Sequence, residues 1–258
     1  MSKVQLGIEK LLNAPPQWLG EKRVGLLTNQ ASVDSRLHNT VDLLVQSYPK
    51  GIKALFGPQH GFSGEKQDNM VESLDFVHPR FNIPVFSLYG TSRVPTGEML
   101  ELIDILLIDL QDIGTRVYTL ITTLAYCLLA AQEHGKKVVV LDRPNPIGGT
   151  AIEGNLLKQE LSSFVGVYPL PMRHGLTIGE AALLFNSEHH IGCNLEVIPM
   201  EGWNRTMYFP ETGLRWRPPS PNMPSPTTAL VYPGQVILEG TNLSEGRGTT
   251  TPFEICGA

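Results

Sequence analysis

Short apolar runs alternate with helical segments through the first half of the chain, and this alternation constrains the fold more than any other feature of the sequence. Runs with the length and the β-branched or aliphatic content of strands occupy residues 23–28, 51–56, 84–88, 103–109 and 137–142. Helical patterns occupy residues 40–48, 98–102 and 119–134. Strands that alternate with helices at this spacing predict a Rossmann-like α/β fold, a mainly parallel sheet with helices on both faces. The run 103–109 is almost wholly apolar, so we expect it to be buried on both faces.

The pattern changes near the segment Pro144-Asn-Pro-Ile-Gly-Gly149. We therefore expect a domain boundary near residue 150, with the Rossmann-like domain at 1–150 and a smaller α+β domain at 151–258. The second part is predicted to contain a helix at 177–186 and strands at 194–199 and 229–232. The chain has 25 Gly and 20 Pro. This combined glycine and proline content is too low for a disordered chain and indicates many ordered turns and loops.

Charge and cysteine content exclude several classes of function. The 258 residues carry 20 Lys and Arg against 25 Asp and Glu, a formal net charge of −5, so the chain lacks the basic field of a nucleic-acid-binding protein. Cys127, Cys193 and Cys256 include no Cys-x-x-Cys spacing, which argues against a disulfide framework or a zinc cluster. No apolar run reaches the roughly 20 residues of a membrane span, and the first residues lack the apolar stretch of a signal peptide. We expect a cytoplasmic protein with no membrane partner; trimming of an N-terminal leader would instead make it secreted or periplasmic.

Common cofactor and nucleophile motifs are absent from the sequence. The first strand is followed by Thr28-Asn-Gln-Ala-Ser32 rather than Gly-x-Gly-x-x-Gly, and no P-loop occurs, so neither NAD nor ATP is predicted. There is no His-Glu-x-x-His and no Gly-x-Ser-x-Gly, and we expect neither a metal nor a serine nucleophile. Cys127 lies in an apolar helix, where a buried structural thiol is expected. The glycine-rich segment 244–250 leaves two interpretations open, an anion-binding nest and a tight turn.

Polar residues follow the ends of all five predicted strands. Because ligands bind outside the carboxyl ends of the strands in an open α/β sheet, these residues are candidates for a binding site. They are Asn29, Gln30, Gln59, His60, Tyr89, Gln111, Asp112, Arg116, Asp142, Arg143 and Asn145. Each Asp or Asn could instead cap the next helix, and Asp112 could instead form an internal ion pair with Arg116. Acids, amides and arginines in loops are the residue types that bind sugar hydroxyls, and glycosidic cleavage usually uses a pair of carboxyl groups.

Several longer motifs resemble one known family. They are Leu88-Tyr-Gly90, Asp109-Leu-Gln-Asp-Ile-Gly-Thr-Arg-Val-Tyr-Thr119, Val140-Leu-Asp-Arg-Pro-Asn-Pro146, Met172-Arg-His-Gly-Leu-Thr-Ile-Gly-Glu180, Pro219-Ser-Pro-Asn222 and Glu239-Gly-Thr-Asn-Leu-Ser-Glu-Gly-Arg-Gly-Thr249. Over essentially the whole chain, the sequence resembles the bacterial exo-β-N-acetylmuramidases of the NamZ type. The resemblance implies a Rossmann-like domain joined to a smaller domain, with the active site in the cleft between them. It also implies hydrolysis of terminal N-acetylmuramic acid from the non-reducing end of peptidoglycan fragments, in cell wall recycling. Similar proteins continue further, so we expect a C-terminally truncated chain with an incomplete second domain.

The resemblance also suggests which residues form the site. Substrate-binding residues would be Gln59, His60, Arg116, Tyr118, Asp142, Arg143, Asn145, Arg173, His174, Asn222, Glu239, Asn242, Glu245 and Arg247, with the arginines as bidentate partners of the lactyl carboxylate. In the family, the loop after the second strand carries a catalytic glutamate in Pro-Glu-His-Gly. This chain has Gln59 there, and a neutral amide cannot transfer a proton in the ordinary way.

Another carboxyl group, that of Glu65, Glu72 or Asp112, would then be the catalytic acid. One alternative is a sugar-binding module without catalysis, and another is a phosphate or nucleotide binder that uses residues 246–249. The expected partner of a glycosidase is a small-molecule amino-sugar substrate, and no cofactor is needed.

Overall fold

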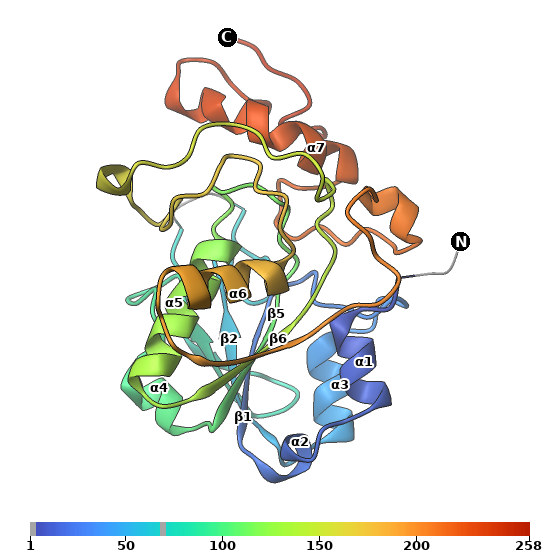
Figure 1. The fold of residues 1–258 in the computed structure, drawn as a ribbon, viewed down its shortest axis with the longest axis vertical. Coiled ribbons are helices and arrows are strands. Elements are labelled where there is room, and N and C mark those ends of the chain that lie inside the picture. The colour runs from blue at the N-terminus through green and yellow to red at the C-terminus, as the bar shows by residue number, and fades with distance from the viewer. Residues whose placement is uncertain (1–3, 68–70) are drawn as a thin grey trace.

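A seven-stranded sheet forms the centre of the computed structural model, which describes residues 4–67 and 71–258 (Figure 1). Its strands are β1 (Val24–Thr28), β2 (Ile52–Gly57), β3 (Phe76–Val77), β4 (Pro84–Ser87), β5 (Ile105–Asp109), β6 (Lys137–Leu141) and β7 (Asn194–Ile198). The order across the sheet is β3-β4-β2-β1-β5-β6-β7, and every neighbouring pair is parallel except β3 and β4. The parallel strands therefore follow the 3-2-1-4-5-6 order of a Rossmann fold, which confirms the predicted fold class.

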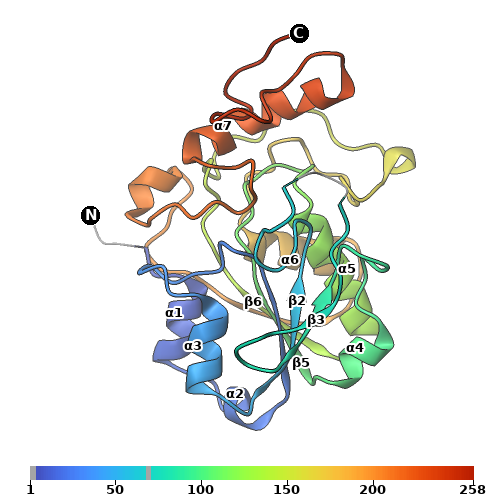
Figure 2. The ribbon, with the colours of Figure 1, turned by 180° about the vertical axis from the view of Figure 1, so that it is seen from behind.

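Helices cover both faces of the sheet (Figures 1 and 2). One face carries α1 (Gly7–Asn13), α2 (Trp18–Glu21) and α3 (Thr40–Ser47), and the other carries α4 (Gly97–Glu101), α5 (Leu120–Glu133) and α6 (Ile178–Glu188). Successive residues of a strand point to opposite faces, so Leu26 packs in the core with α1 and α3 while Leu27 packs in the core with α5 and α6. All residues of β1 and β5 are buried, as a strand covered on both sides requires.

Most of the predicted elements are confirmed to within about two residues, including the helices around residues 40–48, 119–134 and 177–186. The strand predicted at 229–232 is wrong, because these residues lie in the helix α7 (Pro226–Gln235). Ser225 caps this helix, since its Oγ accepts a hydrogen bond from the Thr228 N–H at 3.0 Å. A short apolar run fits a strand or a buried helix equally well, and the cap decides between them.

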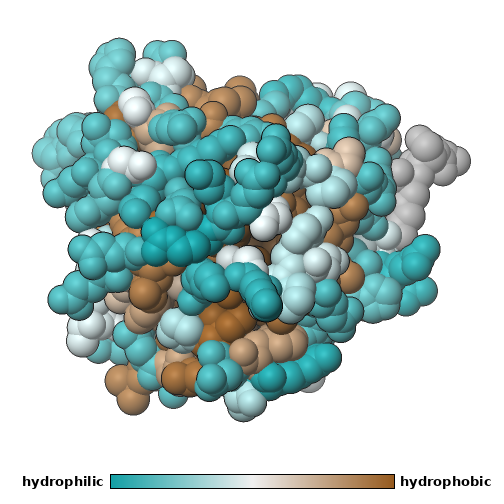
Figure 3. All heavy atoms as spheres, turned by 90° about the horizontal axis from the view of Figure 1, so that it is seen from below, coloured by the Kyte–Doolittle hydropathy of each residue, from teal (hydrophilic) through white to brown (hydrophobic). Residues whose placement is uncertain are grey.

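The sheet continues past residue 150. Helix α6 and strand β7 follow that position, and β7 pairs in parallel with β6 along its whole length. The expected division into domains near residue 150 therefore stays a prediction, and the sheet itself runs to Ile198. The chain after β7, with the 3₁₀ helices η2 (Phe209–Thr212) and η3 (Val236–Gly240) and helix α7, lies over the carboxyl ends of the strands, at the top of Figure 1. At the opposite, amino end, Figure 3 shows a mainly hydrophilic face with smaller hydrophobic groups between.

Candidate active site

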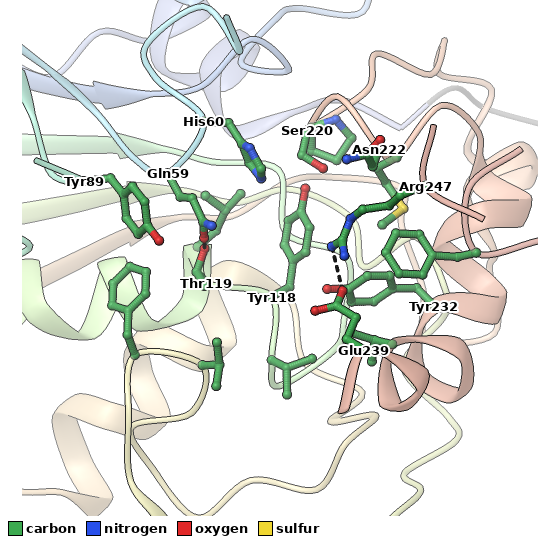
Figure 4. A pocket seen from close by; sticks show the side chains of 18 of the residues that line it. Gln59, His60, Tyr89, Tyr118, Thr119, Ser220, Asn222, Tyr232, Glu239 and Arg247 are labelled. Atoms are coloured by element: carbon green, nitrogen blue, oxygen red, sulfur yellow. Dashed lines mark hydrogen bonds and ion pairs between the residues drawn. The ribbon is translucent and has the colours of Figure 1, made fainter. Parts of the chain in front are cut away.

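A cavity of about 450 Å³ lies beyond the carboxyl ends of β2, β4 and β5 (Figure 4). Its volume suits a small-molecule ligand. The loops after these three strands form one side, and the segments 164–172 and 219–253 form the rest. The polar and aromatic lining residues are Gln59, His60, Tyr89, Arg93, Tyr118, Thr119, Phe164, Ser220, Asn222, Tyr232, Glu239, Arg247 and Phe253.

Gln59 presents an amide to the cavity from the loop after β2. Its Oε1 accepts a hydrogen bond from Thr119 Oγ1 at 2.6 Å, which leaves the Nε2 hydrogens for a ligand. Thr119 is the N-cap residue of α5, yet its hydroxyl bonds Gln59 rather than an N–H of the helix. The start of α5 therefore lacks a side-chain cap, and the Thr119 hydroxyl orients Gln59 instead. A lost helix cap of this kind is expected at a functional site.

His60 is held in a single orientation beside Gln59. Its Nδ1 lies 2.9 Å from the carbonyl oxygen of Lys66, so the ring donates a hydrogen bond from Nδ1 and Nε2 carries the free lone pair. Burial lowers the pKa of His60, and the charge of Arg247 lowers it further, so the neutral ring is favoured at pH 7. The backbone of His60 has φ 74°, a left-handed conformation that a side chain adopts at a cost of roughly 1–2 kcal/mol. Strain of this kind is concentrated at functional sites.

Two buried tyrosines, Tyr118 and Tyr232, form the inner wall. Their rings meet edge to face, with centroids 5.9 Å apart. Burial raises the pKa of both hydroxyls well above the ordinary value, so both remain neutral and can donate hydrogen bonds. The Tyr118 hydroxyl points toward Ser220 and Asn222 lies beyond it, so hydroxyl and amide groups converge at this end of the cavity (Figure 4).

Arg247 and Glu239 form the side opposite Tyr89 (Figure 4). Arg247 Nη2 lies 2.6 Å from Glu239 Oε1, and Nη1 lies 2.9 Å from Glu245 Oε1. The guanidinium also packs over the Phe253 ring, with Cζ 5.0 Å from the centroid. Glu239 supplies the one carboxylate among the described residues that line the cavity, and the Arg247 charge is already compensated.

The crevice at the topological switch point, between β1 and β5, is filled by the protein's own side chains. Asp109 ends β5 there, fully buried, and Arg143 donates to it from Nε at 2.5 Å and from Nη2 at 2.8 Å. Thr40 Oγ1 donates to the same carboxylate at 2.6 Å. Ligands commonly bind at this point of a doubly wound sheet, but here an ion pair occupies it and the cavity lies to one side.

Other predicted residues hold loops together instead of lining the cavity. Asp142 caps α6, since it accepts from Gly179 N at 2.8 Å and from Thr177 Oγ1 at 3.1 Å. The structure therefore favours the capping alternative for this residue. Asn145 bonds the carbonyl oxygen of Leu176 at 2.9 Å and the N–H of Ile147 at 3.1 Å.

The arginines of the second and fourth motifs are also engaged away from the cavity. Arg116 donates to the carbonyl oxygens of Asn155 and Leu170, so the proposed ion pair with Asp112 is not formed. Arg173 binds Glu153 Oε2 at 2.8 Å and bonds the carbonyl oxygen of Ile147.

The three predicted catalytic carboxylates do not line the cavity. Asp112 is buried, and its Oδ2 accepts from Gly114 N at 2.7 Å and lies 3.5 Å from His174 Nε2. Glu65 and Glu72 are exposed, on either side of residues 68–70, which lie outside the described residues. Glu65 bonds the N–H of Ser63 at 3.0 Å. Asn242 is exposed as well, so these roles stay predictions that the cavity geometry does not support.

Arg93 and Phe164 line the cavity although the sequence reasoning did not select them. Arg93 follows the third predicted strand, in Tyr89-Gly-Thr-Ser-Arg93, so the rule that polar residues after strands bind ligands could have included it. Phe164 lies in an irregular stretch with no such signal.

The described part of the chain contains neither a candidate membrane span nor a candidate metal site. No helix there is long and apolar enough to cross a bilayer. Residues 4–67 and 71–258 contain no group of three or more His, Cys, Asp or Glu side chains placed to hold a metal ion. Cys127 is a buried free thiol, and burial raises its pKa, as expected of a structural cysteine.

Fold and cavity together define the class: a Rossmann-like α/β protein with a polar and aromatic cavity for a small molecule beyond its strand ends. The chain belongs to the NamZ family. The family model described as "Exo-beta-N-acetylmuramidase NamZ, N-terminal" matches residues 24–227, and the corresponding C-terminal model matches residues 230–258. The first model ends at residue 227 and the second begins at residue 230, both within α7.

Similar proteins agree with this family. A protein of Bacillus subtilis (strain 168) named "Peptidoglycan beta-N-acetylmuramidase NamZ" is 50% identical over 256 residues, which are 99% of this chain and 62% of that protein. Two crystal structures of DUF1343 family proteins from Bacteroides fragilis superpose with TM-scores of 0.90 and 0.83, at 43% and 32% identity. They are covered to 65% and 67% of their length, so the chain spans about two thirds of these relatives or slightly less.

Proposed function

We propose that this chain acts as a glycoside hydrolase that releases terminal N-acetylmuramic acid from peptidoglycan fragments. One observation carries the proposal: residues from separate family-like motifs, Tyr118, Asn222, Glu239 and Arg247, converge with Gln59 around a single cavity. The Bacillus subtilis relative, half identical in sequence, is named for this activity. A small-molecule amino sugar is therefore the partner we propose.

The cavity lining suits a sugar ring. Aromatic rings such as Tyr89 and Tyr232 offer faces to the apolar side of a pyranose, and the amides of Gln59 and Asn222 can bond its hydroxyls or its N-acetyl group. Hydrolysis adds water at the anomeric carbon and returns a proton to the leaving oxygen, through a transition state with positive charge on the ring. We assign to His60 the removal of a proton from the attacking water, because its Nε2 has a free lone pair and the neutral ring is favoured at pH 7. The imidazolium formed in this way can return that proton to the leaving oxygen. Glu239 is the carboxylate that the cavity offers to the developing positive charge.

A second function, sugar binding without hydrolysis, is favoured by Gln59. The family resemblance implies a glutamate at this position, and the amide that replaces it faces the cavity and bonds Thr119. An amide keeps the shape and hydrogen bonds of a carboxyl group but cannot exchange its proton.

Two measurements on the full chain separate the functions. Binding of N-acetylmuramic acid is measured by calorimetry, and release of free N-acetylmuramic acid is measured from a muramic-acid-terminated disaccharide. Binding with release supports the hydrolase, binding without release supports the binding module, and neither binding nor release contradicts both.

The variant Gln59→Glu tests the residue directly. If the chain is a binding module that lost its acid, Gln59→Glu should gain release of N-acetylmuramic acid while its sugar affinity changes little. If the chain already hydrolyses through His60, the variant should leave release within about tenfold of the original, and His60→Gln should abolish it. Gln132→Glu, an exposed site on α5, is the matched control and should change neither quantity.

We also place this activity in the cytoplasm. The three cysteines are free thiols, one of them exposed, which suits a reducing compartment. Fractionation of cells with an antibody to the chain tests this placement, and recovery outside the cytoplasm contradicts it.

A further inference from the structure

Arg93 is a cavity-lining cation held on an aromatic platform. Its Cζ lies 4.6 Å from the centroid of the Tyr89 ring and 4.8 Å from that of Phe164, and the two ring centroids are 5.5 Å apart. Such packing fixes the plane of a guanidinium and shields it from water. Among the described residues no carboxylate pairs with Arg93, and its buried Nε has no hydrogen-bond partner.

The other candidate arginines are already occupied. Arg247 shares the cavity but binds Glu239 and Glu245 at 2.6 and 2.9 Å. Arg116, Arg143 and Arg173 bond carbonyl oxygens or carboxylates elsewhere and do not line the cavity. Among the described residues that line the cavity, Arg93 is therefore the arginine whose charge no carboxylate neutralises, and it can bind an anion.

We propose that Arg93 binds the lactyl carboxylate of a muramic acid residue and so selects muramic acid over N-acetylglucosamine; this inference rests on the proposed function. The two sugars differ by a lactyl ether whose carboxylate is the one charge on N-acetylmuramic acid. A planar guanidinium binds a carboxylate through two parallel hydrogen bonds, and the low polarity around Tyr89 and Phe164 strengthens them.

Charges on the opposite side of the cavity favour one orientation of the bound sugar. Arg93 packs on the ring of Tyr89, and Tyr89 lies across the cavity from Arg247 and Glu239 (Figure 4). A sugar carboxylate beside Glu239 would meet a like charge, whereas beside Arg93 it meets an unpaired cation. The charge distribution therefore orients the ring, with the lactyl group toward the loop after β4.

Calorimetric binding of N-acetylmuramic acid, its lactyl methyl ester and N-acetylglucosamine tests the inference. The original chain should bind the acid at least about tenfold more tightly than the ester or N-acetylglucosamine, as expected for a charge-assisted pair. Arg93→Met should lose that preference and keep its affinity for N-acetylglucosamine. Arg93→Lys keeps the positive charge but lacks the planar guanidinium, so it should retain part of the preference for the acid. The matched control is Arg80→Met, because Arg80 also packs on an aromatic ring, 4.9 Å from Phe81, and does not line the cavity.

The outcomes separate this inference from the function on which it rests. Equal binding of acid and ester by the original chain, or an undiminished preference in Arg93→Met, overturns the role of Arg93 and leaves sugar binding intact. If Arg93→Met does not fold, an undiminished preference for the acid over the ester in Arg93→Lys overturns the two-bond contact of the guanidinium as well. Binding of none of these sugars by the original chain contradicts the proposed function and the inference together.

Discussion

Replacing Arg143 by methionine should destabilise the fold strongly. The change leaves Asp109 fully buried, and the Thr40 hydroxyl is then its one remaining side-chain donor among the described residues. The bonds from Arg143 Nε at 2.5 Å and Nη2 at 2.8 Å are lost. The carbonyl oxygen of Val33 also loses its 2.9 Å bond from Nη2. Removing one partner of a buried ion pair costs about 3–5 kcal/mol. A domain of this kind is stable by about 5–15 kcal/mol, so a large share of its stability would be lost.

Urea unfolding followed by circular dichroism measures this change in the free energy of unfolding. Arg215→Met, at an exposed arginine with no described ion pair, is the control and should shift it by at most about 0.5 kcal/mol. The double variant Asp109→Asn with Arg143→Met should recover part of the loss, because no unpaired charge then stays buried. A loss under about 1 kcal/mol in Arg143→Met would refute the reasoning. Since Arg143 does not line the cavity, the folded fraction should bind N-acetylmuramic acid with unchanged affinity.

Two further substitutions test the loops around the site. Burial raises the pKa of Asp142 to about 6, above its ordinary 3.8, so the stability it contributes is complete below about pH 4 and is lost as pH rises through 6. Asp142→Asn should flatten the pH dependence of the unfolding free energy between pH 4 and 7, and equal slopes for both proteins would contradict this. Gly114→Ala should cost about 2–5 kcal/mol, because Gly114 has φ 79° and a Cβ there would lie 2.4 Å from Asn145 Oδ1. A thermal melt measures this cost, and an unchanged Tm would argue against it.

The sheet was predictable because its signals are local. The apolar run that became β5 is too hydrophobic for any position except the middle of a covered sheet, and the spacing of strands and helices then fixes parallel pairing. Helix α7 was mispredicted because Ala229-Leu-Val-Tyr232 has strand composition, while its helical state depends on Ser225 and on packing against the rest of the chain. Propensity is a weak guide where tertiary contacts decide.

The site was predictable only in part. A polar residue after a strand has the same sequence pattern whether its side chain faces a ligand or caps a helix. Gln59 and Asp142 both follow strands, yet the structure brings Gln59 to the cavity and uses Asp142 to cap α6. Arg143 and Arg247 both stand in family-like motifs, yet Arg143 pairs with Asp109 away from the cavity and Arg247 pairs with Glu239 in the cavity wall. Arg93 stands outside those motifs, and its lack of a carboxylate partner becomes visible only in three dimensions.

The shared wall of the cavity would couple binding of the proposed sugar to the packing of the chain's last segment. Gln59 and His60 come from the sheet, whereas Tyr232, Glu239 and Arg247 come from α7 and the residues after it. A ligand that touches both sides binds the docked arrangement and not the undocked one, so the two equilibria are thermodynamically linked. A sugar at a hundredfold its Kd would hold the segment in place by about 2.7 kcal/mol. Conversely, a change that loosens α7 lowers sugar affinity without removing a single contact to the sugar, so hydrogen exchange in α7 reports occupancy of the cavity.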